Sequence, residues 1–328
     1  MKSLEAKLER IRTNRYRPQD FIIADAKDGD IGFGRMAPGA DPQRPGYWRA
    51  RSFHLDSVRE MTRSGLVDIM LLSASTCERL SLEGLFAEGP VTPAIRLNDT
   101  TDIWSARGGR YKEQPSRHHR TARLDHARRH AGLGLYSITF SNERDIDAIN
   151  AEAYSDFRRE AGEADMQHFL EVFNPAFDIN LAGGADIGSF VNDNIVRTLA
   201  GVMEDDFPRF LKMQFNGPRA TEELASYDPG RLIVGILGGA AGTTRDTFEL
   251  VGQSERYGAR VALFGRKIMQ AEHPLELVRH MRRVVEGDLG AEEAVRSYHG
   301  ELQKLDIAPK LDLARDREIT EEPLLAGA

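Results

Sequence analysis

The sequence predicts an α/β protein whose eight parallel strands close into a (β/α)8 barrel, the TIM-barrel fold. Three observations support this prediction. Eight short apolar or β-branched runs recur, segments with helical spacing follow several of them, and neither a composition shift nor an internal repeat divides the chain. Strands that alternate with helices pair in parallel through right-handed crossovers. Eight such units fit a closed barrel better than an open, doubly wound sheet. We therefore expect a single barrel domain over residues 1–328.

Each predicted strand is a short run of mostly apolar or β-branched residues. In chain order these runs are 21–25, 68–73, 94–98, 135–140, 169–173, 210–215, 232–237 and 260–265. Helical spacing of apolar residues predicts the helices between them. These helices are 55–64, 142–161, 190–204, 246–257 and 274–286. Because the carboxyl ends of barrel strands meet at one mouth, polar residues at those ends are the candidates for chemistry.

The two ends of the chain lie outside the minimal barrel. Residues 1–17 predict an extra helix with Leu4, Leu8 and Ile11 on one face. We expect this helix to cover the bottom of the barrel. Residues 313–328 are acidic and weakly patterned, so we expect a partly ordered extension there.

A long polar connection, residues 99–131, follows the third strand and is rich in arginine and histidine. Long connections on the carboxyl side of barrel strands are often functional lids. A solvated or subunit-contact insertion is the alternative. His126 and His130 have i, i+4 spacing, but no carboxylate completes a metal-ligand pattern, so we expect no metal site.

Composition and charge indicate the protein's class and compartment. Hydrophobic residues make up 41% and charged residues 29%, which is ordinary for a globular enzyme. The net charge of −7 argues against a nucleic-acid binder, which needs a basic surface. A single cysteine, Cys77, excludes an intramolecular disulfide. The amphipathic N-terminus does not fit a signal peptide, and no apolar run approaches the ~20 residues of a membrane span. We therefore expect a cytoplasmic protein without a membrane partner.

Lys212 is the most informative residue, because it lies in the apolar run 209–215. Side chains alternate along a strand, so Lys212 shares one face with Phe210 and Gln214. An ammonium among apolar neighbours is costly to desolvate unless it is paired or used. A lysine with a pKa lowered by burial can form a Schiff base with a carbonyl compound. The alternative is a structural ion pair or a strand-end lysine that reaches water.

At the ends of other predicted strands, polar residues occupy the positions whose side chains, by the same alternation, point to the side that Lys212 faces. If the polar member of each strand end faces inward, they form one charge-compensated cluster above an apolar barrel interior, and such clusters usually mark function. This set comprises Asp25, Arg96, Asn98, Ser137, Thr139, Glu171, Lys212 and Gln214.

Glycine-rich turns after the last two strands predict an anion site. Gly238 and Gly239 follow the seventh strand, and Gly265 and Arg266 follow the eighth. Small residues let backbone N–H groups approach an anion, and arginine can bind it through two hydrogen bonds. The loops after strands seven and eight are the usual phosphate cradle of such barrels. Phosphate, sulfonate and carboxylate would all suit it.

These features resemble the class I (Schiff-base) aldolase superfamily of barrels, above all the archaeal-type fructose-bisphosphate aldolases, the tagatose-bisphosphate aldolases and their relatives. The shared motifs are the lysine of the sixth strand, the glycine pair after the seventh, and Gly265-Arg266-Lys267 after the eighth. The resemblance covers most of residues 20–285. It implies that Lys212 forms the imine, that Asp25 and Glu171 assist proton transfers or hold hydroxyls, and that the glycine-arginine segment binds phosphate. It also implies a homo-oligomer.

The chain departs from this family near the first strand, where relatives often carry Asp-His and this sequence has Asp25-Ala26. Some relatives also place a catalytic tyrosine on the fourth strand, whereas strand parity points Tyr136 outward. These departures bear more on which substrate the protein accepts than on the type of reaction.

We therefore expect reversible aldol cleavage of a phosphorylated ketose or a related sugar acid, with no metal or organic cofactor. An inward Arg96 would lower the pKa of Lys212 through its charge. Gln214 and Asn98 would contact the substrate. Two alternatives remain open: retro-Claisen or acyl transfer on a 3-oxo sugar phosphate through the same lysine, and a non-catalytic barrel that binds a sugar phosphate.

Overall fold

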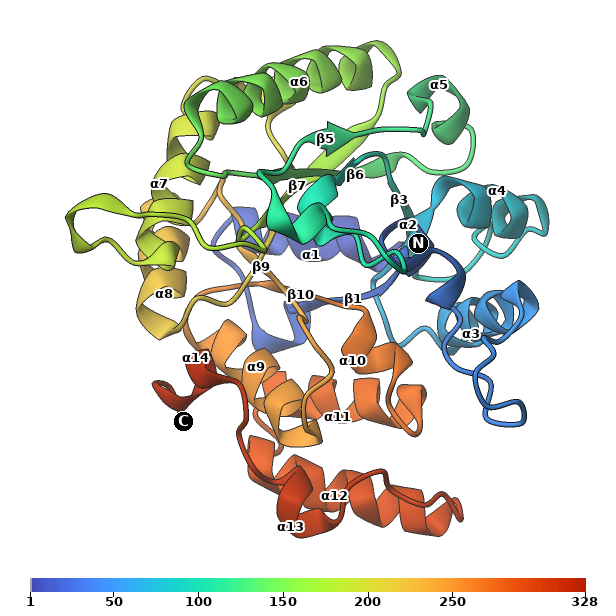
Figure 1. The fold of residues 1–328 in the computed structure, drawn as a ribbon. Coiled ribbons are helices and arrows are strands. Elements are labelled where there is room, and N and C mark those ends of the chain that lie inside the picture. The colour runs from blue at the N-terminus through green and yellow to red at the C-terminus, as the bar shows by residue number, and fades with distance from the viewer. Residues whose placement is uncertain (1) are drawn as a thin grey trace.

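Eight parallel strands close into a barrel in a computed structural model that describes residues 2–328 (Figure 1). The predicted fold class is therefore confirmed, and each of the eight predicted strands is present. The largest error in a strand end is at the start of the seventh barrel strand, which begins at Gly235 instead of residue 232. In barrel order the strands are β1 (Ile22–Lys27), β10 (Val261–Phe264), β9 (Gly235–Leu237), β8 (Leu211–Met213), β7 (Gln167–Phe173), β6 (Leu133–Thr139), β3 (Thr92–Arg96) and β2 (Ile69–Ser73).

All five helices predicted between the strands are present. They are α3 (Arg51–Ser64), α6 (Arg144–Glu163), α7 (Ile187–Leu199), α9 (Thr244–Arg256) and α11 (Pro274–Val285). The sequence patterns missed several helices, most of them shorter than three turns. These are α2 (Gly29–Phe33), α4 (Ala74–Leu82), α5 (Leu124–Ala127), α8 (Pro218–Tyr227), α10 (Arg266–Met269), α12 (Ala291–Lys304), α13 (Leu313–Asp316) and α14 (Glu322–Leu325). Single 3₁₀ turns are η1 (Pro18–Asp20), η2 (Gly34–Met36), η3 (Thr101–Ile103), η4 (Tyr111–Glu113), η5 (Ala182–Gly184) and η6 (Glu204–Asp206).

Helix α1 (Ser3–Arg12) covers the bottom of the barrel, as expected for residues 1–17; Met1 lies outside the described residues. Its apolar face carries Leu4, Leu8 and Ile11. These side chains pack in one cluster with the inward residues of the strands, because both surfaces are apolar and neither is otherwise covered. The amino end of the barrel is therefore closed, and the open mouth is at the carboxyl ends of the strands.

The inward face of the barrel changes from apolar to charged toward the mouth. Ala94, Phe169 and Phe210 lie in the interior cluster with α1. Side chains alternate along a strand, so the residues two positions further on point to the same interior, one layer nearer the mouth. These residues are Arg96, Glu171 and Lys212. Strand register places Glu171 and Lys212 directly side by side on β7 and β8.

The first part of the insertion 99–131, which includes η3 and η4, lies over the mouth, whereas α5 lies at the outer edge of the barrel. The insertion is irregular for most of its length. It contains η3, η4 and α5, and its strands β4 (Asp99–Thr100) and β5 (His118–His119) form a separate antiparallel pair. Figure 1 views the barrel from the mouth, with α1 behind the strands and the turns of the insertion in front of them. Asp102 fixes the insertion to the barrel rim, because its carboxylate accepts hydrogen bonds from Thr139 Oγ1 and Ala176 N, each at 3.3 Å.

The C-terminal residues 313–328 are folded, so the expectation of a partly ordered extension is wrong. In Figure 1 they run from α13, beside α12, to α14, beside α9. Leu324 is buried in the main core. Asp316 forms a hydrogen bond with His299 at 2.8 Å, and Glu321 forms an ion pair with Lys267 at 2.6 Å. The acidic composition therefore reflects specific pairing rather than disorder.

Among the described residues, no helix is both long and apolar enough to cross a membrane.

Candidate active site

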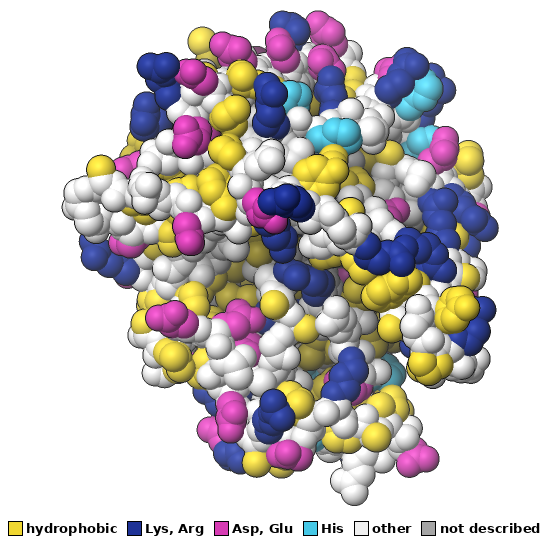
Figure 2. Space-filling view, viewed as in Figure 1, with side chains coloured by type: hydrophobic (Ala, Val, Ile, Leu, Met, Phe, Trp, Pro, Cys, Tyr) yellow, Lys and Arg dark blue, Asp and Glu magenta, His cyan; other side chains and the backbone are white. Residues whose placement is uncertain are grey.

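A cavity of about 290 Å³ opens at the mouth of the barrel. Lys212, Glu171, Arg96 and Asp28 line it, together with the glycine turns after β9 and β10 and parts of the insertion. Figure 2 shows lysine and arginine side chains gathered near the centre of this face. The cavity-lining cations are Lys27, Arg96, Lys112, Lys212 and Arg266.

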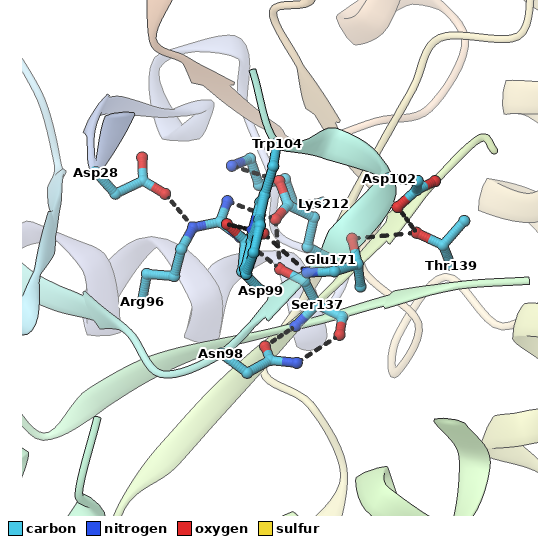
Figure 3. Close-up of polar contacts among 11 residues, drawn as sticks. Asp28, Arg96, Asn98, Asp99, Asp102, Trp104, Ser137, Thr139, Glu171 and Lys212 are labelled. Atoms are coloured by element: carbon cyan, nitrogen blue, oxygen red, sulfur yellow. Dashed lines mark hydrogen bonds and ion pairs between the residues drawn. The ribbon is translucent and has the colours of Figure 1, made fainter. Parts of the chain in front are cut away.

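Lys212 faces this cavity from β8, the sixth strand of the barrel. Its side chain is only 6% exposed, and its Nζ lies 2.6 Å from Glu171 Oε1 (Figure 3). The two atoms form an ion pair but do not align as a hydrogen bond. The inward orientation predicted for both residues is confirmed. Burial beside one carboxylate is an environment in which an amine can exchange a proton locally.

Arg96 occupies the centre of the polar cluster (Figure 3). Its Nη2 donates to Glu171 Oε2 at 2.7 Å, and its Nη1 donates to Ser137 Oγ at 2.8 Å and to Asp99 Oδ1 at 3.2 Å. Its Nε contacts the carboxylate of Asp28. Arg96 points inward, as predicted. Asp28, Asp99 and Glu171 pair with its charge, however, so Arg96 is not the free second cation that was expected from the sequence beside Lys212.

The pKa values of Asp28 and Asp99, two of the carboxyl groups around Arg96, shift in opposite directions. Burial alone would raise the pKa of Asp28, but Arg96 and Lys212 hold that pKa below its usual range. Burial raises the pKa of Asp99 to about 6, although Arg96 opposes this shift. Asp99 also accepts a hydrogen bond from Trp104 Nε1 at 3.1 Å. Asp28 is therefore ionised at neutral pH, and Asp99 can change its charge near it.

The prediction that Asp25 points into the mouth is wrong. Ile22 and Ala24 fill the barrel interior, so Asp25 faces the surrounding helices. Its buried carboxylate lies 3.5 Å from Lys27 Nζ, and burial raises its pKa, partly opposed by Lys27. Asp28 instead supplies the carboxylate at this side of the mouth.

The predicted contact of Asn98 with substrate is not supported by its position. Its amide accepts a hydrogen bond from Ser137 N at 2.5 Å and donates one to Ser137 O at 2.8 Å. Asn98 therefore joins two strands and does not line the cavity. Gln214 does line the cavity, where its Oε1 accepts a hydrogen bond from Asn174 N at 2.6 Å.

The four residues predicted as an anion cradle lie together on one wall of the cavity. They are Gly238, Gly239, Gly265 and Arg266. A Cβ at Gly265 would lie 2.7 Å from the carbonyl oxygen of Ala26, so only glycine fits this close approach of β10 to β1.

Several cavity residues were missed by the sequence patterns. Asp28 and Asn174 each follow directly after a strand, Asp99 lies three residues beyond the end of β3, and Lys112 comes from the insertion. Asp28 and Asp99 could have been found from their positions one and three residues beyond a strand end. Lys112 gave no such signal, because loop positions have no regular periodicity.

Comparisons with known proteins show which solved structures are similar to this chain in fold. No protein-family model matches the chain, and no curated protein matches its sequence. An archaeal fructose 1,6-bisphosphate aldolase is similar in structure, with a TM-score of 0.61 and 16% identity over 87% of this chain and 99% of that one.

Two further solved structures are similar to the same degree. An archaeal fructose-1,6-bisphosphate aldolase, whose catalytic lysine is covalently bound to the carbinolamine intermediate, gives a TM-score of 0.60 and 17% identity over 86% of this chain and 99% of that one. A protein from Corynebacterium glutamicum gives a TM-score of 0.58 and 17% identity over 88% of this chain and 98% of that one. The chain thus has the barrel fold of the archaeal Schiff-base aldolases, as the sequence resemblance predicted.

Proposed function

We propose that this protein is a class I aldolase that cleaves a C–C bond of a phosphorylated ketose, or of a related sugar acid, through a Schiff base on Lys212. The observation that carries the proposal is the position of Lys212. It lies in the middle of β8, the sixth barrel strand, against Glu171, in a cavity shared with the glycine-arginine turns. The similarity in fold to an aldolase with a covalently bound catalytic lysine supports it. On the family resemblance we further propose a cytoplasmic homo-oligomer.

The neutral amine of Lys212 attacks the ketone carbon, and loss of water leaves a protonated imine. Glu171 Oε1, at 2.6 Å, is placed to take the proton that the amine must lose. The imine accepts the electron pair of the breaking C–C bond, and an aldehyde leaves. Protonation of the resulting enamine and hydrolysis of the imine then release the second product and restore Lys212.

Asp28 is the best-placed group to take the hydroxyl proton during C–C cleavage. Both oxygens of Glu171 are occupied, because Arg96 and Ser137 bind Oε2 and Lys212 lies against Oε1. Asp28 lines the cavity, and its low pKa keeps it ionised. We assign Glu171 to the proton exchange of Lys212, and Arg96 to positioning both carboxylates.

A phosphate bound by Gly238, Gly239, Gly265 and Arg266 would hold the far end of the donor. Binding energy from this remote group orients the carbonyl toward Lys212. Gln214 lines the same cavity and would contact the donor between the two sites.

Borohydride trapping tests the proposal. Wild-type protein is incubated with a panel of phosphorylated ketoses, reduced with sodium borohydride and analysed by peptide mass spectrometry. We expect a stable adduct on the peptide that contains Lys212, with an aldehyde as the released product. An acid or thioester product would indicate the acyl-transfer alternative. Ligand binding without any adduct would indicate a non-catalytic barrel.

Asp28→Asn is expected to lower kcat about 10²–10⁴-fold, the usual contribution of a general acid–base. The imine at Lys212 should still form, because Asp28 does not contact the amine through a hydrogen bond. Steady-state kinetics and borohydride trapping measure the two effects separately. The matched control is Asp25→Asn, which is expected to change thermal stability but to leave kcat within about threefold. If Asp25→Asn lowered kcat and Asp28→Asn did not, Asp25 instead of Asp28 would be the group that takes the hydroxyl proton.

A further inference from the structure

We propose that the C-terminal tail, residues 313–328, is a clamp that positions the anion cradle and thereby sets its affinity for phosphate. This inference rests on the proposed function, because it concerns the site that would hold the donor's phosphate. The tail itself does not line the cavity. It contacts the outer side of the loop 238–243, between β9 and α9.

The loop 238–243 needs external support to keep one conformation. Gly239 and Gly242 have φ values of +65° and +61°, in the left-handed region that glycine favours. Within residues 2–328, the backbone N–H groups of Gly239, Ala240 and Ala241 donate no hydrogen bond to another backbone group. Free N–H groups of this kind are what an anion requires, but they leave the loop without a hydrogen-bond ladder of its own.

The tail supplies hydrogen bonds where the loop enters α9. Thr243 Oγ1 donates to the Glu318 carbonyl oxygen at 2.8 Å, and Thr244 N donates to Asp316 Oδ1 at 2.7 Å. Asp246, in the first turn of α9, accepts a hydrogen bond from Thr320 N at 2.7 Å. The tail thus fixes the C-terminal end of the loop from outside the barrel.

Glu321 and Lys267 connect the tail to both halves of the cradle. Lys267 follows Arg266, but its fully buried side chain points away from the cavity. Its Nζ lies 2.6 Å from Glu321 Oε1 and donates to the Ala241 carbonyl oxygen at 3.2 Å. One buried ammonium therefore joins the segment after β10, the loop after β9 and the tail. A Cβ at Gly242 would lie 3.1 Å from Glu321 Oε1, so the loop packs closely on this carboxylate.

The clamp predicts that removing Glu321 changes the affinity for phosphate in the direction opposite to that expected from charge alone. Glu321 is a negative charge near an anion site, so its removal would strengthen anion binding if only charge mattered. If Glu321 holds the loop in shape, its removal weakens anion binding, because displaced N–H groups no longer converge on the anion.

The experiment measures binding of inorganic phosphate to the full-length protein by isothermal titration calorimetry. Glu321→Ala is expected to raise the Kd for phosphate about tenfold. Glu321→Gln keeps an oxygen that can accept from Lys267, so its Kd should stay within about threefold of wild type. The control is Arg317→Ala, which removes a tail contact to Glu292 on α12 and not to the loop, and should leave the Kd unchanged.

Two further readouts separate positioning from general damage. Thermal unfolding should show that all variants fold cooperatively. Borohydride trapping of Lys212 with the unphosphorylated ketone dihydroxyacetone should be equal in wild type and Glu321→Ala. Unchanged or tighter phosphate binding in Glu321→Ala would overturn the clamp, as would equal weakening in Arg317→Ala. If wild-type protein binds no phosphate, the clamp fails, whereas trapping at Lys212 still decides the aldolase proposal.

Discussion

Replacing Lys212 with methionine is expected to lower kcat/KM by at least about 10⁴-fold toward any ketose that the wild type cleaves, because the imine cannot form without the amine. Methionine has a similar length and suits the buried position, where the lysine side chain is 6% exposed. The protein should therefore remain folded. Steady-state kinetics and borohydride trapping measure the loss of turnover and of the covalent adduct.

Lys27→Met provides the matched control, because Lys27 is a second buried lysine beside the same cavity. Its removal leaves Asp25 without its cation, so we expect lower stability but an intact adduct on Lys212. An adduct that persists in Lys212→Met and disappears in Lys27→Met would identify Lys27 as the nucleophile.

Replacing Arg96 with methionine is expected to destabilise the protein by about 3–5 kcal/mol at pH 7, the usual cost of breaking a buried ion network. The variant leaves Asp28, Asp99 and Glu171 close together without the cation that they share. Urea-induced unfolding measures the change. Arg96→Lys is expected to recover part of it, because a lysine keeps the charge but cannot make the forked contacts of a guanidinium.

The pH dependence of this loss has a definite sign. Arg96 helps to hold the pKa of Asp28 below its usual value. A depressed carboxylate pKa contributes stability above the unfolded pKa, and the contribution is lost as the pH falls through the folded pKa. The difference between wild type and Arg96→Met should therefore shrink below about pH 4. A difference under about 1 kcal/mol at pH 7 would mean that the three carboxylates do not depend on Arg96.

The strands of this barrel could be predicted because their apolar runs are short and separated by clear helical segments. The same alternation placed Glu171 and Lys212 correctly, since their neighbours on both sides are large and apolar. The fold resemblance and the closure of the barrel bottom by α1 followed from the same patterns. Short helices such as α4 and α8 were missed because their buried faces include small or polar residues, among them Thr76 and Thr221, which weaken the apolar repeat.

The errors in the site come from positions where burial depends on tertiary packing. Asp25 was predicted to face inward because it is polar, but the small side chains of Ala24 and Ala26 suit the crowded interior and leave Asp25 outside. Asn98 has the correct parity for the mouth, yet its amide is used by the backbone of Ser137. The acidic tail was expected to be only partly ordered because its partners, Lys267 and His299, are distant in the sequence.

The register between β7 and β8 has a consequence for how this protein can change over evolutionary time. Glu171 and Lys212 meet because they are direct partners in a backbone ladder. Adding or deleting one residue early in β8 would turn Lys212 toward the outer helices and bring Leu211 or Met213 into the mouth. Loops around the rim can vary in length without disturbing this pair, whereas the length of β8 is fixed as long as Lys212 must lie beside Glu171.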